Sequence, residues 1–157
     1  EQVAAIKHAA LRSPVVYTAN FSLGITVMQE VLRLITPILE DSFDMEVIEK
    51  HHNKKLDAPS GTAKMLVETL NPDGIYAEVY GREGNGKRQK EIGIHAVRGG
   101  SIVGEHSVIY AGEDEVLEIK HEAHSKHVFA NGAIKAAEFL VGKPAGLYDM
   151  HDVLFRK

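Results

Sequence analysis

The sequence contains no cysteine and no long hydrophobic run. Without cysteine, the chain cannot hold a disulfide framework, a cysteine-ligated zinc or iron–sulfur site, or a thiol nucleophile. No apolar stretch approaches the roughly 18 residues of a membrane span, and the first residues, EQVAAI, lack the basic and apolar segments of a secretory signal. These absences predict a cytoplasmic protein that does not interact with a membrane.

An excess of basic residues is also missing. The chain has 18 lysines and arginines against 22 aspartates and glutamates, and its net charge is -4. A chain of this charge offers no basic face for a phosphate backbone, so we expect no nucleic-acid partner. The 157 residues are 44% hydrophobic and 25% charged, which is typical of a globular domain with a buried core.

The first twenty residues predict a helix followed by a strand. Apolar residues recur at helical spacing over residues 1–11, Pro14 interrupts the helix, and the β-branched residues that follow predict a buried strand over 15–19. A helix followed by a strand is typical of the last unit of a parallel α/β sheet. Because the chain begins at Glu1, without a methionine and inside a helical pattern, we expect a longer polypeptide to precede it.

The middle of the chain predicts a sheet with few helices. A long amphipathic helix is expected over 27–39, with Pro37 either kinking it or ending it, and a strand over 45–49 follows. Ser60 predicts the N-cap of a second helix. Four further strands are expected over 78–80, 91–98, 101–111 and 115–121, before a last helix over 128–141. Four consecutive strands imply an α+β fold with an open mixed or antiparallel sheet. Its uncovered face should be apolar, which favours self-association.

The stretch from Glu49 to Ala63, EKHHNKKLDAPSGTA, carries the densest chemistry. Two histidines and three lysines precede a helix N-terminus, whose outward N–H groups favour an anion. Ser60, Gly61 and Thr62 would supply these donors, and Gly61 would let a ligand approach the backbone closely. A lysine could neutralise the same anion and a histidine could transfer a proton. The stretch therefore predicts a carboxylate or phosphate site, although a solvated loop with an ordinary cap has the same residues.

Other kinds of site do not fit the sequence. The chain has neither the G-x-x-x-x-G-K-[ST] motif of a P-loop nor a G-x-G-x-x-G dinucleotide motif. His121, His124 and His127 are spaced by three residues, unlike the H-E-x-x-H motif of zinc enzymes, so we predict no metal site. His95 and His106 lie within predicted strands, where a structural role is expected.

The motif E-x-H-H-x-x-K-x-D-x-P-S-G-T-A, met at every fixed position from Glu49 to Ala63, resembles the signature of dihydrodipicolinate reductases. Three further segments share the resemblance: TANFS at 18–22, RGGSIVGEH at 98–106 and FANGA at 129–133. Together they extend over nearly the whole chain. The resemblance implies an enzyme that reduces a cyclic dicarboxylate with NADH or NADPH in the diaminopimelate route to lysine.

The resemblance also implies roles for individual residues. His51 would donate the proton and Lys55 would be its catalytic partner. The substrate carboxylates would be held by His52, Ser60, Gly61 and Thr62, and the nicotinamide cofactor would meet Thr18, Ala19, Asn20 and Phe21. A loop after a parallel strand is a physically suitable place for a cofactor, although the same four residues could form a simple hinge.

The resemblance divides the chain into three parts. Residues 1–21 would end a dinucleotide-binding Rossmann domain, residues 22–127 would form the substrate and tetramerisation domain, and residues 128–157 would return to the nucleotide domain. The residues that select NADH or NADPH would lie outside this sequence, so we expect the 157-residue chain alone to be inactive. The resemblance further implies a homotetramer assembled through the sheet. Two alternatives remain open, a non-catalytic sensor of small anions and a purely structural oligomerisation module.

Overall fold

A computed structural model describes residues 2–156 and divides them into two compact units. The larger unit comprises residues 27–125, and the smaller unit combines residues 2–26 with residues 126–156. The larger unit carries the Glu49–Ala63 stretch. Among residues 2–156, no helix combines the length and the apolar character that a membrane crossing requires.

The larger unit is built on a five-stranded mixed sheet with the strand order β3-β4-β2-β5-β6. Its strands are β2 (Asp44–His51), β3 (Ala77–Tyr80), β4 (Glu91–Arg98), β5 (Gly104–Ala111) and β6 (Val116–Ala123). β4 runs parallel to both β2 and β3, whereas β5 is antiparallel to β2 and to β6. The predicted α+β class with a mixed sheet is confirmed.

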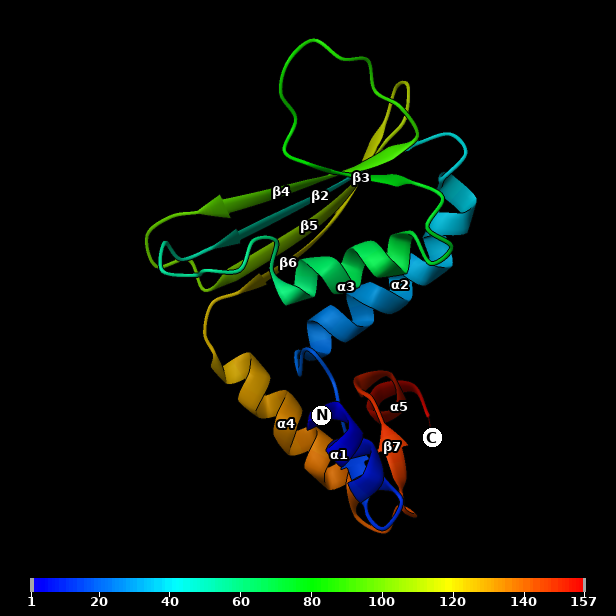
Figure 1. Cartoon of the computed structure of the whole chain (residues 1–157), viewed down its shortest axis with the longest axis vertical. Helices are drawn as coiled ribbons and strands as arrows, with labels where there is room; N and C mark the ends of the chain where they lie inside the picture. The colour runs from blue at the N-terminus through cyan, green and yellow to red at the C-terminus, as the bar shows by residue number, and fades with distance from the viewer. Residues whose placement is uncertain (1, 157) are drawn as a thin grey trace. The chain divides into compact units, whose positions relative to one another are not determined.

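Two helices cover one face of this sheet (Figure 1). They are α2 (Leu23–Leu39) and α3 (Gly61–Leu70). The hydroxyls of Thr36 on α2 and Tyr110 on β5 are hydrogen-bonded at 2.6 Å, and burial raises the pKa of Tyr110 to about 12. The buried side chains of these helices and strands include Met28, Leu32, Met45, Val47, Leu66, Val67, Leu70, Ile92, Ile94, Val108 and Tyr110.

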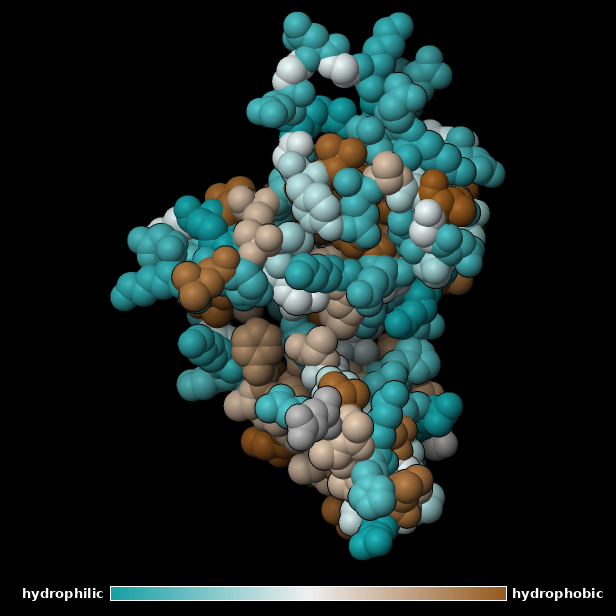
Figure 2. All heavy atoms as spheres, viewed as in Figure 1, coloured by the Kyte–Doolittle hydropathy of each residue, from teal (hydrophilic) through white to brown (hydrophobic). Residues whose placement is uncertain are grey.

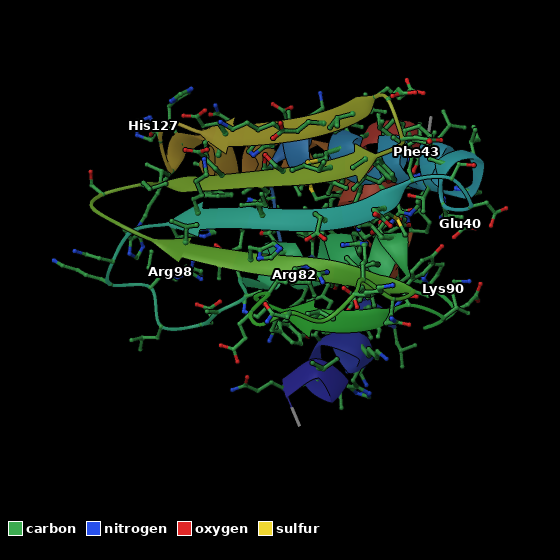
Figure 3. All side chains as sticks on the ribbon, turned by 90° about the horizontal axis from the view of Figure 1, so that it is seen from above. Glu40, Phe43, Arg82, Lys90, Arg98 and His127 are labelled. Atoms are coloured by element: carbon green, nitrogen blue, oxygen red, sulfur yellow. The ribbon has the colours of Figure 1, made fainter. Side chains whose placement is uncertain are left out.

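The other face of the sheet carries charged side chains beside exposed apolar ones such as Val97 and Val116, so it is mixed rather than apolar as expected. Successive residues of a strand point to opposite faces, and on β2 this places Glu46 and Lys50 on the uncovered side. Lys50 Nζ donates to Glu105 at 3.0 Å, and Lys120 Nζ lies 2.9 Å from the same carboxylate. Figure 3 looks onto this open face, with Arg98 at the opposite end of the sheet from Phe43.

The smaller unit joins the two ends of the chain. It contains α1 (Gln2–Ala10), β1 (Pro14–Val16), α4 (His127–Leu140), β7 (Gly146–Tyr148) and α5 (Met150–Phe155). β1 pairs in parallel with β7. At Gly132 of α4 an added Cβ would lie 1.7 Å from the Phe21 carbonyl oxygen, so only glycine allows this close approach.

The strand predicted over residues 15–19 is shorter and less buried than expected. β1 ends at Val16, and its three residues are only half-buried. The chain turns after Tyr17, where the Thr18 hydroxyl donates to the Asn20 carbonyl at 3.0 Å and accepts the Asn20 N–H at 3.3 Å. These local hydrogen bonds compete with continuation of the strand.

Candidate functional site

The candidate site lies at the end of the sheet where β2 and β4 finish (Figure 1). Because these neighbouring strands are parallel, their carboxyl ends lie at the same end of the sheet, and the loops that follow them lie together. The Gly99 N–H donates to the His51 carbonyl at 2.9 Å, and the Asn53 N–H donates to the Gly100 carbonyl at 3.2 Å. Gly100 has a φ of +48°, a conformation that favours glycine.

Glu49 is a fully buried carboxylate near the carboxyl end of the central strand β2. Its oxygens accept hydrogen bonds from both terminal nitrogens of Arg98, at 2.7 and 2.6 Å. They also accept the Ser60 N–H at 2.9 Å and His51 Nδ1–H at 2.6 Å. Burial raises the pKa of Glu49, but the hydrogen bonds from Arg98, His51 and Ser60 outweigh it and hold the pKa below its usual value. The carboxylate is therefore ionised at neutral pH.

His51 has one nitrogen held and the other available. Nδ1 is held by Glu49, and the His51 side chain is 11% exposed. Nε2 lies beside Gly104, where an added Cβ would be only 3.1 Å away. The absence of a side chain at Gly104 thus lets Nε2, the nitrogen that Glu49 does not hold, lie close to the backbone of β5.

The N-terminus of α3 begins beside this pair. Ser60 is the predicted N-cap, and its Oγ accepts the Ala63 N–H at 3.1 Å. Gly61 is exposed, and a Cβ there would meet nothing within 4 Å. The first N–H groups of a helix have no acceptor within the helix, so an anion can approach this turn from solvent.

His106 supports the same turn from below. Its Nε2 is hydrogen-bonded to Ser60 Oγ at 3.0 Å, and its ring meets the His51 ring edge-on with the centroids 5.1 Å apart. Burial, with a smaller contribution from the neighbouring His51, lowers the pKa of His106 to about 4. His106 is therefore neutral at pH 7.

The other predicted residues of the stretch take different positions. Lys55 Nζ lies 2.8 Å from Asp57 Oδ1, and a hydrogen bond from Lys55 lowers the pKa of that carboxyl group. Within the described chain, the buried Nδ1 of His52 has no hydrogen-bond partner. Lys50, in contrast, belongs to the open face, where it pairs with Glu105.

The four residues predicted to meet a cofactor follow β1 in the smaller unit. The side chains of Thr18 and Asn20 hold their own loop, since Asn20 Oδ1 also accepts the Ser22 N–H at 2.7 Å. Ala19 is exposed between them, and Phe21 is half-buried.

Three residues of the larger unit contribute to the site but were not predicted to do so: Glu49, Arg98 and His106. A signal for Glu49 was present, because it follows Met45 and Val47 in the alternation that buries one face of β2. A carboxylate at a buried position of the strand needs a hydrogen-bonding or charged partner. Arg98, which supplies it, comes from a separate strand and could not be paired with Glu49 from local pattern.

Comparison with known proteins agrees with this architecture. Residues 24–154 match the family described as "Dihydrodipicolinate reductase, C-terminus". The chain is 52% identical over 156 residues to the 4-hydroxy-tetrahydrodipicolinate reductase of Brachyspira hyodysenteriae, an alignment that covers 97% of the chain and 67% of that protein. It is 50% identical to the Clostridium novyi reductase of the same name, with 100% of the chain and 64% of that protein covered.

A solved structure has the same fold. The dipicolinate-bound dihydrodipicolinate reductase from Paenisporosarcina sp. TG-14 superposes with a TM-score of 0.73 at 21% identity, covering 98% of this chain and 59% of that one. The chain spans about two thirds of the length of the curated relatives. With the family match over residues 24–154, these relationships establish that the chain belongs to the dihydrodipicolinate reductase family and corresponds to its C-terminal part.

Proposed function

We propose that this chain is the substrate-binding and assembly portion of an NADH- or NADPH-dependent 4-hydroxy-tetrahydrodipicolinate reductase. The reaction converts the cyclic dicarboxylate to tetrahydrodipicolinate on the diaminopimelate route to lysine. The observation that carries the proposal is the pairing, at one sheet edge, of a held histidine with an open helix N-terminus. Family membership supports the same function.

His51 is the proposed proton donor. Its Nδ1–H is fixed by the Glu49 carboxylate, so Nε2 is the nitrogen that faces a ligand. Lys55, the proposed catalytic partner, approaches from the loop after β2 and is held by Asp57. Its ammonium group would offset the negative charge of a substrate carboxylate and favour proton transfer from His51.

The substrate carboxylates would be bound by His52, Ser60, Gly61 and Thr62. Gly61 and Thr62 form the first turn of α3, where the positive end of the helix dipole favours an anion. Open space above Gly61 allows a carboxylate to reach the backbone. The dipicolinate named for the Paenisporosarcina protein is a dicarboxylate of this kind.

The cofactor would supply hydride to the substrate when it is bound. The residues present here fit only a limited part of its site. The loop after β1 offers the exposed Ala19, while Thr18 and Asn20 stabilise the loop. We assign residues 1–21 and 128–157 to a nucleotide-binding domain and residues 22–127 to the substrate domain. The association of both chain ends in one unit supports this division.

We also propose that copies of the chain assemble as a homotetramer through the sheet. The edge strand β6 exposes Val116 and Leu117, and the open face carries lysines beside glutamates that could pair between copies. Light scattering at micromolar concentration should give the mass of four chains. A monomer would contradict this assignment.

A fusion enzyme tests the function. The chain is joined to the N-terminal portion of the Brachyspira hyodysenteriae reductase that it does not span, and oxidation of NADH or NADPH is followed with the substrate. His51→Gln should lower kcat by about 100-fold or more with a much smaller change in KM. Lys55→Met should also lower kcat, whereas Lys54→Met, one residue away and exposed, should not. A fusion that binds dipicolinate without turnover would favour an anion sensor.

A further inference from the structure

We propose that Glu49 is the positioning residue of the site, which fixes the proton donor and the anion-binding helix with one buried carboxylate. The inference rests on the proposed function, in which His51 donates the proton and the α3 N-terminus binds a substrate carboxylate. It adds a residue that touches neither the substrate nor the cofactor.

The geometry of Glu49 determines which nitrogen of His51 is available. A carboxylate can only accept hydrogen bonds, so the 2.6 Å contact places the proton of the neutral ring on Nδ1. Nε2 is then the acceptor in the neutral ring and the donor when the ring is charged. Without Glu49, the neutral ring could place its proton on either nitrogen and could rotate away from Gly104.

The same carboxylate fixes the start of α3. Its other oxygen accepts the Ser60 N–H at 2.9 Å, and Ser60 is the N-cap whose hydroxyl engages Ala63 and His106. A shift of Glu49 would therefore move the proton donor and the first turn of α3 together.

Arg98 extends this control to the loop that carries Lys55. Its guanidinium group binds both oxygens of Glu49 and also donates to the Asp57 carbonyl at 2.7 Å. Asp57 in turn holds Lys55 through its carboxylate. Three segments of the site are thus connected to one buried anion, and the bidentate ion pair keeps that anion charged.

The open face provides a matched control. Glu46 lies three residues earlier on β2, binds His95 Nε2 at 2.6 Å and pairs with Arg88. Its side chain is 21% exposed, and its histidine belongs to the opposite face of the sheet. Glu46→Gln therefore removes the same charge from the same strand without changing the site.

The kinetic test compares Glu49→Gln with Glu46→Gln in the fusion enzyme. Glu49→Gln should lower kcat by about 10-fold to 100-fold, while Glu46→Gln should leave kcat within about twofold. Glu49→Gln combined with Arg98→Met removes both charges of the ion pair. This pair should regain stability but not kcat, whereas recovery of both would indicate a purely structural role.

A second measurement uses only the wild-type chain, so it does not require that any variant folds. Long-range ¹H–¹⁵N spectra of the wild-type chain, at a pH where the His51 ring is neutral, should show the proton on Nδ1. A proton on Nε2 would overturn the inference, as would a Glu49→Gln enzyme with wild-type kcat when His51→Gln is inactive. If His51→Gln itself keeps full turnover, the proposed function fails instead, and the spectrum still reports on Glu49.

Discussion

The two faces of the sheet carry the same three residue types for different purposes. Each face has a glutamate of β2 bound to a histidine and to at least one arginine, and Glu46 is also paired with Arg82. The sets are Glu49 with His51 and Arg98 on the helix-covered face, and Glu46 with His95 and Arg88 on the open face. A Glu–His–Arg cluster is therefore not in itself a sign of catalysis.

The difference lies in position and burial. Glu46 is partly exposed, and Arg88 attaches the loop between β3 and β4 to the sheet, a loop that is almost entirely hydrophilic (Figure 2). Glu49 is completely buried at the carboxyl end of β2, where three chain segments meet. Its histidine keeps a second nitrogen, which lies against Gly104. We therefore assign the proposed function to the cluster at the strand end and a structural role to the other.

Removal of the arginine should give the largest difference in stability between the two clusters. Arg98→Met leaves the Glu49 charge buried without its partner and should lower the free energy of unfolding by about 3–5 kcal/mol. Arg88→Met affects a carboxylate that water can reach, and about 1–2 kcal/mol is expected. Urea unfolding at pH 7 measures both. Equal losses would mean that burial does not distinguish the clusters.

Acid should destabilise the covered face through His106. Its pKa is about 4 in the folded chain against 6.5 for an ordinary histidine, so between these values the unfolded chain binds a proton that the folded chain does not. Stability should therefore fall as the pH drops from 6.5 to 4, by up to about 3 kcal/mol. The lowered pKa of Glu49 adds a further loss below about pH 4.5.

The comparison variant for this prediction is His106→Gln, which can still form a hydrogen bond with Ser60. Urea unfolding at intervals between pH 7 and pH 4 should show a flatter profile for the variant than for the wild type. Profiles of identical slope would exclude His106 as the source of the acid sensitivity.

Two glycines should distinguish stability from activity. At Gly93 a Cβ would collide with the Glu46 carboxylate, 1.8 Å from Oε2, so Gly93→Ala should lower the free energy of unfolding by about 1–3 kcal/mol and leave kcat unchanged. At Gly104 the Cβ would lie 3.1 Å from His51 Nε2. Gly104→Ala should cost less than about 1 kcal/mol of stability but lower kcat/KM roughly tenfold.

The free energy of unfolding and kcat/KM of Gly93→Ala and Gly104→Ala, both measured in the fusion enzyme, show whether one variant loses mainly stability and the other mainly activity. Gly86→Ala, where a Cβ meets nothing within 4 Å, controls for the substitution itself. If Gly104→Ala keeps full kcat/KM, the space beside His51 is not used by the substrate.

The smallest effect is expected on the open face. Lys120 is exposed and bridges Glu105 and Glu122, so Lys120→Gln should lower stability only slightly. Salt screens exposed charges, and the difference should vanish in about 0.5 M NaCl. Thermal unfolding at low and high salt provides the measurement. A large loss of stability that persists at high salt would show that the ion pairs of this face contribute to the stability of the fold.

Local pattern predicted the elements that depend on neighbouring residues. The Ser60 cap and the four late strands follow from capping chemistry and from residue alternation, and their ends differ by a few residues at most from those predicted. The pairing of β1 with β7 joins segments from opposite ends of the chain, and no local pattern specifies it. The turn after Val16 was likewise missed, because side-chain hydrogen bonds in residues 18–20 ended the strand.

The site was predicted in part for the same reason. His51, His52, Lys55 and the α3 N-terminus are contained in one contiguous stretch, so its motif brought them together. Glu49 was in the same stretch, but its role depends on Arg98, which the parallel pairing of β2 and β4 places opposite His51. Sheet topology, rather than sequence distance, completes the site.

A titration of the ¹⁵N-labelled chain with dipicolinate tests the central claim most directly. We expect the largest chemical-shift changes at His51 Nε2 and at the backbone amides of Gly61 and Thr62, with His95 unaffected. Changes concentrated around His95 and Arg88, or spread evenly over both faces, would contradict the assignment of the ligand site to the end of β2.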